Sequence, residues 1–301
     1  MKNKVITVFG TGFIGKNLIF QLLKDGYIVR AVCRRPYLAG DIGLMGNVGQ
    51  LEIVSGNIVN IDSIEGYFRT SDIIINLVGV LHESGGENYF NSHVTGPENI
   101  SYLSKKHGID KLIHISSVGA NKDSESRYQS TKGAGEEILI KNFPLASIIR
   151  PSIVFGPDDG FYNVQSKIVK MSPIVPMFGG GQNKFQPIYV KDLVSGIMSI
   201  LNDNKCQGLI YEFGGPDILT MEEVYRLILK TLKINRILIP APIFAANFMA
   251  TFIQLFPNPI ITRDLVKALK FDNIISENAN TIQSLGIDPK PSELIVPTYL
   301  K

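Results

Sequence analysis

Short apolar runs alternate with longer segments of helical spacing along the first two hundred residues. The runs are rich in Ile and Val and read apolar throughout, which is typical of strands buried on both faces. They predict strands over Val5–Phe9, Ile28–Cys33, Leu51–Val54, Asp72–Leu77, Lys111–Ile115 and Leu145–Arg150. Helices are predicted between them over Phe13–Lys24, Tyr89–His107 and Arg127–Lys141.

This alternation predicts an α/β fold, a Rossmann-type doubly wound parallel sheet with right-handed crossovers. From Gly156 onward Pro and Gly become frequent, and the tail from Thr220 is mostly helical in pattern, with proline breaks. We therefore expect a nucleotide-binding sheet domain over 1–155, to which 185–215 returns. A smaller, mostly helical C-terminal lobe for a substrate or partner is expected from 156–184 and 216–301.

Composition narrows the function classes. The chain has 301 residues, 45% of them hydrophobic, and a formal net charge of +3, too mild to indicate nucleic acid as a partner. Cys33 and Cys206 lie far apart without metal or redox spacing, so we expect no metal site and a reducing compartment. The opening "MKNK" resembles neither a secretory signal nor a transit peptide, which predicts a cytoplasmic rather than secreted protein.

The stretch "ITVFGTGFIGKNL" places Gly10, Gly12 and Gly15 between an apolar strand and a helical pattern. G-x-G-x-x-G spacing arises by chance in roughly a quarter of chains with this many glycines, so the context carries the interpretation. In a dinucleotide site the three glycines allow a tight turn, close approach of the pyrophosphate and close helix–strand packing. The alternative is a turn without a ligand.

The end of the second strand bears on which dinucleotide is held. NAD sites carry an acidic residue there for the ribose 2′-hydroxyl, but no carboxylate occurs between Gly26 and Gly40. Arg34 and Arg35 stand in its place, and guanidinium groups suit a 2′-phosphate. This favours NADP(H) over NAD(H), with a solvated basic turn as the alternative.

The ends of two further predicted strands also carry residues that suit a dinucleotide site. Asn57 follows the third strand, where its amide either reaches the adenine or caps a turn. The fourth strand ends in "NLVG", with Val78 and Gly79 allowing the backbone to approach a cofactor.

Ser117, Tyr128 and Lys132 are the reactive candidates. Tyr128 and Lys132 are spaced i, i+4, so they share one helix face. An ammonium group beside the phenol lowers its pKa and suits it to pass a proton while a hydride moves. Ser117, at the end of the fifth strand, can hold the same substrate oxygen. Tyr102 and Lys106 match the same spacing and are interpreted as helix surface.

The motifs "TGFIG", "HISS", "YQSTK" and "IIRPSIVFGP" resemble the short-chain dehydrogenase/reductase superfamily, of the extended or atypical, epimerase/dehydratase-like kind. The stretches "RPSIVFGPDDGF" and "FQPIYVKDL" and the proline-broken tail are similar to one subgroup of it. That subgroup contains the nucleotide-binding accessory subunit of respiratory complex I and bacterial relatives. The resemblance covers essentially the whole chain and implies a Rossmann domain that holds NADPH, which in the mitochondrial subunit serves structure or assembly.

The resemblance also implies roles for individual residues. The residues expected at the cofactor are Gly10, Thr11, Gly12, Phe13, Ile14, Gly15, Arg34, Arg35, Asn57, Val78, Gly79, His93, Lys132 and Pro151. Those expected at the reaction centre are Tyr128, Lys132 and Ser117. His93 stands where many catalytic relatives have Asn, and its charge is expected to change near pH 6.5.

One stretch suggests a docking surface. Residues 237–262 contain no charged side chain, and Pro240, Pro242, Pro257 and Pro259 leave too short a helix to span a bilayer. The alternatives are a core helix of the smaller lobe, or an apolar face that docks onto a membrane or a respiratory-complex subunit. The second would place the protein peripherally on the inner membrane.

Three function classes follow. The chain is an NADP(H)-dependent oxidoreductase, an NADPH-bearing accessory or assembly protein of NADH:quinone oxidoreductase, or a sugar-nucleotide epimerase or dehydratase that recycles its cofactor. Arg34 argues against the third class, which usually goes with NAD.

Overall fold

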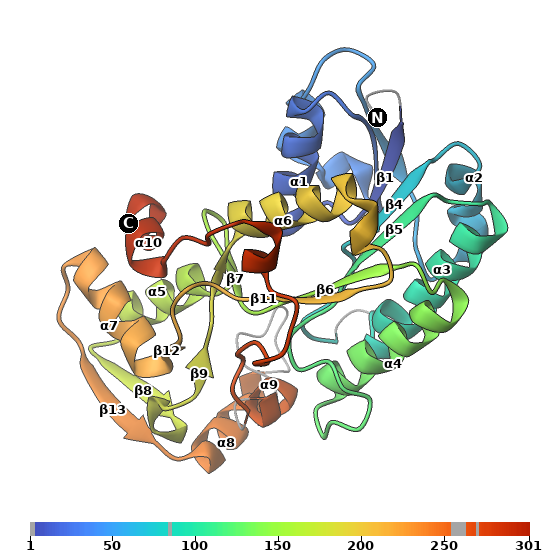
Figure 1. Ribbon diagram of the computed structural model, residues 1–301. Coiled ribbons are helices and arrows are strands. Elements are labelled where there is room, and N and C mark those ends of the chain that lie inside the picture. Colours follow the sequence, from blue (N-terminus) through green and yellow to red (C-terminus); the bar gives the residue numbers. More distant parts are fainter. Residues whose placement is uncertain (1–3, 84–85, 254–262, 269–270) are drawn as a thin grey trace. The chain divides into compact units, whose positions relative to one another are not determined.

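A seven-stranded parallel sheet with flanking helices dominates the N-terminal half of the chain (Figure 1). The computed structural model describes residues 4–83, 86–253, 263–268 and 271–301. The strand order is β11-β6-β5-β4-β1-β2-β3. The strands are β1 (Val5–Phe9), β2 (Ile28–Cys33), β3 (Leu51–Ser55), β4 (Ile73–Asn76), β5 (Lys111–Ile115), β6 (Ser147–Pro151) and β11 (Ile210–Phe213). The predicted fold class is confirmed, and the six predicted strands are present with ends shifted by at most two residues.

Helices cover both faces of this sheet, as the uninterrupted apolar strands require. In Figure 1, α1 and α6 lie on one face and α2, α3 and α4 on the other. Their bounds are α1 (Phe13–Lys24), α2 (Glu65–Phe68), α3 (Gly96–Lys106), α4 (Arg127–Asn142) and α6 (Val190–Asn202). The central strands β4 and β5 are buried at every position. Ile74 and Leu112, one from each strand, join an apolar core that includes Phe9, Leu103 and Ile148.

The predicted helix over Tyr89–His107 is not one uniform helix. Residues Asn91–Thr95 form a π-helical turn, and α3 begins only at Gly96. The carbonyl of His93 in this turn packs against α4 at Gly135, where a Cβ atom would lie 1.7 Å from the carbonyl oxygen. The wide turn fits because Gly135 has no side chain, and π-turns of this kind are frequent at functional sites.

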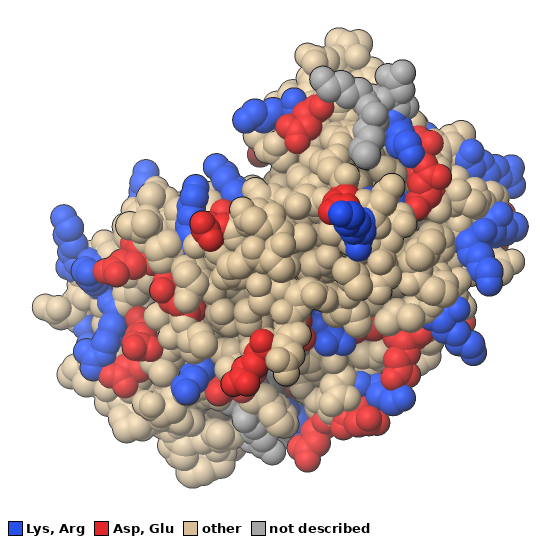
Figure 2. Space-filling view, viewed as in Figure 1, with Lys and Arg blue, Asp and Glu red and all other residues tan. Residues whose placement is uncertain are grey.

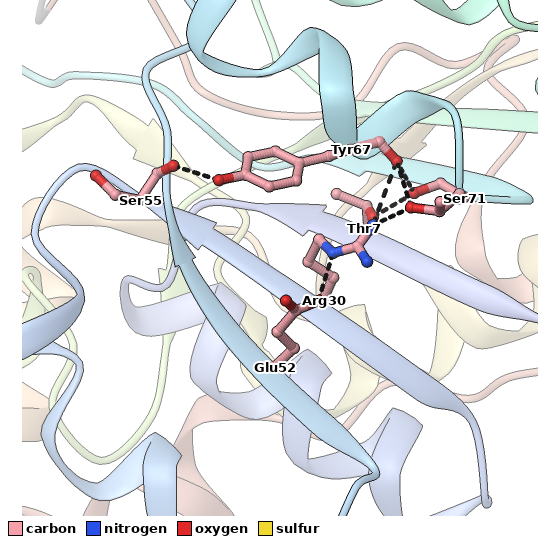
Figure 3. Close-up of polar contacts among 7 residues, drawn as sticks. Thr7, Arg30, Glu52, Ser55, Tyr67 and Ser71 are labelled. Carbon is pink, nitrogen blue, oxygen red and sulfur yellow. Dashed lines mark hydrogen bonds and ion pairs between the residues drawn. The ribbon is translucent and has the colours of Figure 1, made fainter.

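A polar network holds β2 in place between β1, β3 and α2 (Figure 3). Arg30 donates from Nε to Glu52 at 2.7 Å and from Nη1 to the Tyr67 carbonyl at 3.3 Å. The same carbonyl accepts from Ser71 Oγ at 2.7 Å, and the Tyr67 hydroxyl donates to the Ser55 carbonyl at 2.6 Å. Arg30 also lies over the Tyr67 ring. The network fixes the strand that leads to Arg34.

The chain divides into two compact units. The first comprises 1–123, 129–150 and 194–211, and the second comprises 124–128, 151–193 and 212–301. The second unit contains three two-stranded pairs, β10–β7, β12–β9 and β13–β8. Its elements are β7 (Val154–Phe155), α5 (Tyr162–Met171), β8 (Ile174–Phe178), β9 (Lys184–Phe185), β10 (Ile188–Tyr189), β12 (Leu219–Thr220), α7 (Met221–Leu232), β13 (Ile237–Ala241), α8 (Ile243–Ile253), α9 (Arg263–Ala268) and α10 (Ser292–Tyr299).

Among the described residues of the tail, α7, α8, α9 and α10 are helical as expected, whereas β13 is a strand that the sequence pattern does not predict. Pro240 lies within this strand and is tolerated because, among the described strands, β13 pairs with β8 alone and needs no donor toward a second neighbour. Of the uncharged stretch 237–262, residues 254–262 lie outside the described residues. Within the described ranges, no helix is long and apolar enough to cross a bilayer.

Candidate functional site

The glycine turn between β1 and α1 is closed on one side and open on the other. Gly10 has φ +105° and donates its N–H to the Val32 carbonyl at 3.0 Å. A Cβ atom on Gly15 would lie 2.1 Å from the Gly10 carbonyl oxygen, so only glycine fits there. A Cβ atom on Gly12 would meet nothing within 4 Å. The turn is therefore tight where the helix meets the strand and leaves open space at Gly12.

The N-terminus of α1 opens onto that space. Gly12 is the N-cap, no side chain caps the helix, and no acidic residue lies in its first turn. The first N–H groups and the helix dipole thus offer partial positive charge without an internal partner. Thr11, Phe13 and Ile14 are partly buried beside it. These features fit the pyrophosphate of a dinucleotide.

Arg34 and Arg35 are exposed just after β2, as the sequence predicts. The structure adds a partner that sequence reasoning missed, since Arg34 forms an ion pair with Glu87. Glu87 comes from the loop after β4, far from Arg34 in the sequence, so no local pattern indicates the pair. A carboxylate does face this end of β2, but it arrives from another loop.

Asn57 uses its side chain locally. Its Oδ1 accepts from the Val59 N–H at 3.1 Å, and its own N–H donates to Ser63 Oγ at 3.1 Å. Of the two roles considered for Asn57, this geometry favours turn capping.

Buried amide and imidazole groups hold the loop after β4. Asn76 donates from Nδ2 to His114 Nδ1 at 3.1 Å, and its Oδ1 accepts from the Val78 N–H at 3.1 Å. Burial lowers the pKa of His114 to about 3, with Lys132 adding to the effect. A neutral His114 can accept at Nδ1, so the end of β4 and the following Val78–Gly79 segment are fixed.

His93 ties the same loop to α4. Its Nε2 accepts from the Val80 N–H at 3.2 Å, which leaves Nδ1–H to donate to Thr131 Oγ1 at 3.0 Å. Burial lowers the pKa of His93 to about 2, and the nearby Lys132 charge lowers it further. The expected change of charge near pH 6.5 is therefore wrong, because the imidazolium would lose its hydration without gaining a carboxylate.

Lys132 lies fully buried next to this loop. Its Nζ donates to the Ile115 carbonyl at 3.4 Å, and a Cβ atom on Gly79 would lie 3.0 Å from Nζ. Burial lowers the pKa of Lys132 to about 8, with Glu136 acting in the opposite direction. Ser117 Oγ is also buried and has no hydrogen-bond partner among the described residues. A titratable amine and an unused hydroxyl thus remain available in the first unit.

Glu136 is itself neutralised by Arg150. The guanidinium reaches both carboxylate oxygens of Glu136, with Nη2 at 2.6 Å from Oε2 and Nε at 3.1 Å from Oε1. This ion pair links α4 to β6, in a setting where only 3% of the Glu136 side chain is exposed. Pro151, the next residue, is buried at the end of β6 and belongs to the second unit.

Tyr128 also belongs to the second unit, where Asp264 of α9 caps the start of α4. Asp264 accepts from the backbone N–H groups of Arg127 at 2.9 Å and Tyr128 at 3.0 Å, and from Ser126 Oγ at 3.1 Å. Sequence reasoning missed Asp264, because a cap so far away in the chain leaves no local pattern. Asp264 fixes the backbone that carries the Tyr128 phenol.

The structure thus brings His93, Gly79 and Lys132 together in the first unit, which also carries the glycine turn, Arg34 and Ser117. Tyr128 and Pro151 lie in the second unit. Across the described part of the chain, no cluster of three His, Cys, Asp or Glu side chains has the arrangement of a metal site.

Comparison with known proteins agrees with this picture. Residues 6–214 match the model of the "NAD dependent epimerase/dehydratase family". The mitochondrial NADH dehydrogenase [ubiquinone] 1 alpha subcomplex subunit 9 of Arabidopsis thaliana is 33% identical over 95% of this chain and 74% of its own length. Its Dictyostelium discoideum counterpart is 31% identical over 95% of this chain and 81% of its own length. A Bacillus anthracis dTDP-glucose 4,6-dehydratase, solved with NAD, superimposes with a TM-score of 0.75 at 18% identity, covering 99% and 95% of the two chains.

Proposed function

We propose that this chain, which belongs to the NAD dependent epimerase/dehydratase family, holds NADP(H) in its first unit as an accessory or assembly protein of a respiratory NADH:quinone oxidoreductase. The open glycine turn at the uncapped N-terminus of α1 carries the nucleotide part of the proposal. Similarity to alpha subcomplex subunit 9 over 95% of the chain supports the respiratory part. In this role the protein lies on the cytoplasmic side, at the periphery of the inner membrane.

Each expected site residue has a role in this proposal. Gly10, Gly12 and Gly15 shape the cradle for the pyrophosphate, which Thr11, Phe13 and Ile14 flank. Val78 and Gly79 line the nicotinamide end, while Asn57 supports the adenine end through its turn. His93 holds the Val78–Val80 loop, and Lys132 binds the nicotinamide ribose.

Arg34, with Arg35 beside it, selects the 2′-phosphate. In the structure Arg34 is paired with Glu87, so a bound 2′-phosphate has to displace that carboxylate. Both side chains are partly exposed, and pairs of this kind contribute about 0–1 kcal/mol. The phosphate carries more charge than one carboxylate and accepts the guanidinium fork better.

This competition gives a specificity test. We expect Glu87→Gln to strengthen NADPH binding by up to about fivefold, the equivalent of one surface ion pair. Arg34→Gln should weaken NADPH binding at least about tenfold and leave NADH nearly unchanged. Isothermal titration with both nucleotides measures this, and Arg69→Gln, an exposed arginine away from the turn, is the matched control. A larger loss for NADH than for NADPH in Arg34→Gln would overturn the assignment of NADP(H).

A second candidate function, NADP(H)-dependent oxidoreductase, is favoured by one observation: the buried Lys132 amine with its pKa lowered to about 8. The nicotinamide, when bound, supplies the hydride or accepts it. In this reading the Tyr128 phenol holds and moves the proton, the Lys132 charge stabilises the phenolate, and Ser117 binds the substrate oxygen.

Tyr128→Phe separates the two candidates. An enzyme loses its turnover, by at least about a hundredfold for a missing general acid, whereas an accessory protein keeps its nucleotide and its assembly role. Tyr102→Phe is the matched control, because Tyr102 has the same spacing to a lysine but lies exposed on α3. Retained respiratory-complex assembly with Tyr128→Phe supports the accessory role, and lost assembly contradicts it.

A further inference from the structure

One edge of the second unit exposes apolar side chains beside a basic cluster. The chain from Val224 to Arg263 contains no Asp or Glu and carries Arg226, Lys230, Lys233, Arg236 and Arg263. The first four of these cations line a groove of about 480 Å³ with Leu229 and Ile234. Figure 2 shows the area over α8 as almost uncharged, with Lys, Arg, Asp and Glu over α7 and the neighbouring start of β13.

The strand pair β8–β13 contributes an exposed apolar face. Ile237 lies opposite Ile174 in the parallel register, and Ile239 follows two residues later on the same face. All three are exposed, Ile237 to 63%, while Val175 on the opposite face is buried. Parallel strands are normally covered on both faces. An exposed apolar face on such a pair therefore indicates an interaction surface.

Helix α8 continues this surface with aromatic rings. Phe244 and Phe248 are one turn apart and 75% and 67% exposed, while Ala246 and Ala250 on the other side are buried against Val266. The helix carries no charged residue among its described positions. It thus buries its small side chains and presents its largest ones to the outside.

The basic cluster has an excess of positive charge. Arg226 pairs with Glu222 and Lys230 with Glu293, both as exposed ion pairs. Lys233 and Arg236 have no carboxylate partner within the described part of the chain. Arg236 is held next to Ile237 by hydrogen bonds to the carbonyls of Val169 and Asn235. Cations therefore lie directly beside the exposed isoleucines.

We propose that this edge of the second unit, formed by the four cations of α7 and the segment after it, the β8–β13 isoleucines and the α8 phenylalanines, docks onto an anionic phospholipid membrane surface. Interfacial binding combines buried apolar rings with basic residues at the headgroups, and both are present here. A protein partner would be expected to offer carboxylates at fixed positions. A membrane requires only that cations and apolar rings lie at one edge. The proposal goes beyond nucleotide binding, which involves other residues.

The absence of tryptophan from the chain allows a direct test. Phe244→Trp introduces a single tryptophan at the proposed surface, and Phe20→Trp introduces one at an exposed phenylalanine of α1 as the matched control. We expect the Phe244→Trp emission to shift to shorter wavelength with phosphatidylcholine vesicles that contain phosphatidylglycerol. Brominated lipids should quench it, and the Phe20→Trp emission should change with neither.

Charge variants test whether the basic cluster contributes to binding of the same vesicles. Lys230→Gln/Lys233→Gln should reduce vesicle partitioning about 25-fold, at about fivefold for each cation near an anionic surface. Lys105→Gln/Lys141→Gln, which removes two exposed lysines of the first unit, should leave partitioning unchanged. High salt should weaken binding, because the Debye length falls to about 3 Å at 1 M.

Three results would overturn the proposal. They are no binding to either vesicle type, equal binding with and without phosphatidylglycerol, and an unshifted Phe244→Trp emission. The first would point to a protein partner at this surface. Nucleotide retention is measured separately from vesicle binding. A negative vesicle result therefore does not contradict nucleotide binding, and a protein without nucleotide does not contradict the membrane surface.

Discussion

At the scale of single residues, His93 and His114 are buried where water no longer stabilises an imidazolium. Their pKa values are lowered to about 2 and about 3. Between those values and 6.5 the unfolded chain binds more protons than the folded one, so stability falls as the pH falls below about 6.5. The slope is about 1.4 kcal/mol per pH unit for each such histidine. Sequence reasoning placed His93 at the site, but its neutrality depends on packing against α4.

We expect His93→Gln to reduce the acid sensitivity of folding. From pH 7 to pH 5 the variant should lose about 2 kcal/mol less of its free energy of unfolding than the parent protein. Urea unfolding at the two pH values measures this difference. His82→Gln, in the loop after β4, is the control and should follow the parent protein. An unchanged loss in His93→Gln would mean that His93 is not buried neutral.

Burial also lowers the pKa of Lys132, but this side chain is still mostly protonated at pH 7. Its folded pKa of about 8 lies below its ordinary value of 10.5, so burial costs stability at pH 7 and the cost disappears as the pH rises from about 8 to 10.5. Lys132→Met should therefore raise the free energy of unfolding at pH 7 by about 2 kcal/mol while weakening nucleotide binding.

The control for this prediction is Lys105→Met, on the exposed side of α3, which should change neither property. Urea unfolding and NADPH titration at pH 7 and pH 9.5 supply both readouts. If Lys132→Met instead lowered the free energy of unfolding at pH 7, the lysine would be a structural residue rather than one retained for the ligand.

At the scale of elements, the apolar runs were sufficient to predict the strands, because Ile and Val runs buried on both faces leave little alternative. The π-turn at Asn91–Thr95 was missed, because it depends on the absence of a side chain at Gly135 of another helix. β13 was missed for a related reason: its pairing with β8 outweighs the presence of Pro240.

The glycine turn gives an element-scale prediction. Gly15→Ala should destabilise the protein by about 1–3 kcal/mol even without nucleotide, because the added Cβ overlaps the Gly10 carbonyl. Gly12→Val should leave the stability of the ligand-free protein nearly unchanged and weaken NADPH binding, because its side chain enters the open space. Thermal unfolding with and without NADPH distinguishes the two. Equal stability losses in both variants would show that Gly12 has only a structural role.

At the scale of the whole molecule, the order of motifs along the chain was enough to predict the family, and the match over residues 6–214 confirms it. Contacts between distant segments were not predictable. The ion pair of Glu87 with Arg34 and the Asp264 cap on α4 join positions that no periodicity connects. Both lie next to expected site residues, so the sequence indicates where the site is better than how its members are held.

The most direct measurement is the nicotinamide nucleotide content of the freshly purified protein, followed by its exchange with labelled NADPH and NADH. We expect about one NADPH per chain, retained for hours and not displaced by NADH, because a nucleotide that serves as a structural part binds tightly and its tight binding stabilises the fold. Exchange within seconds would indicate a working redox site instead. A protein that carries no nucleotide and binds neither form would contradict the central claim.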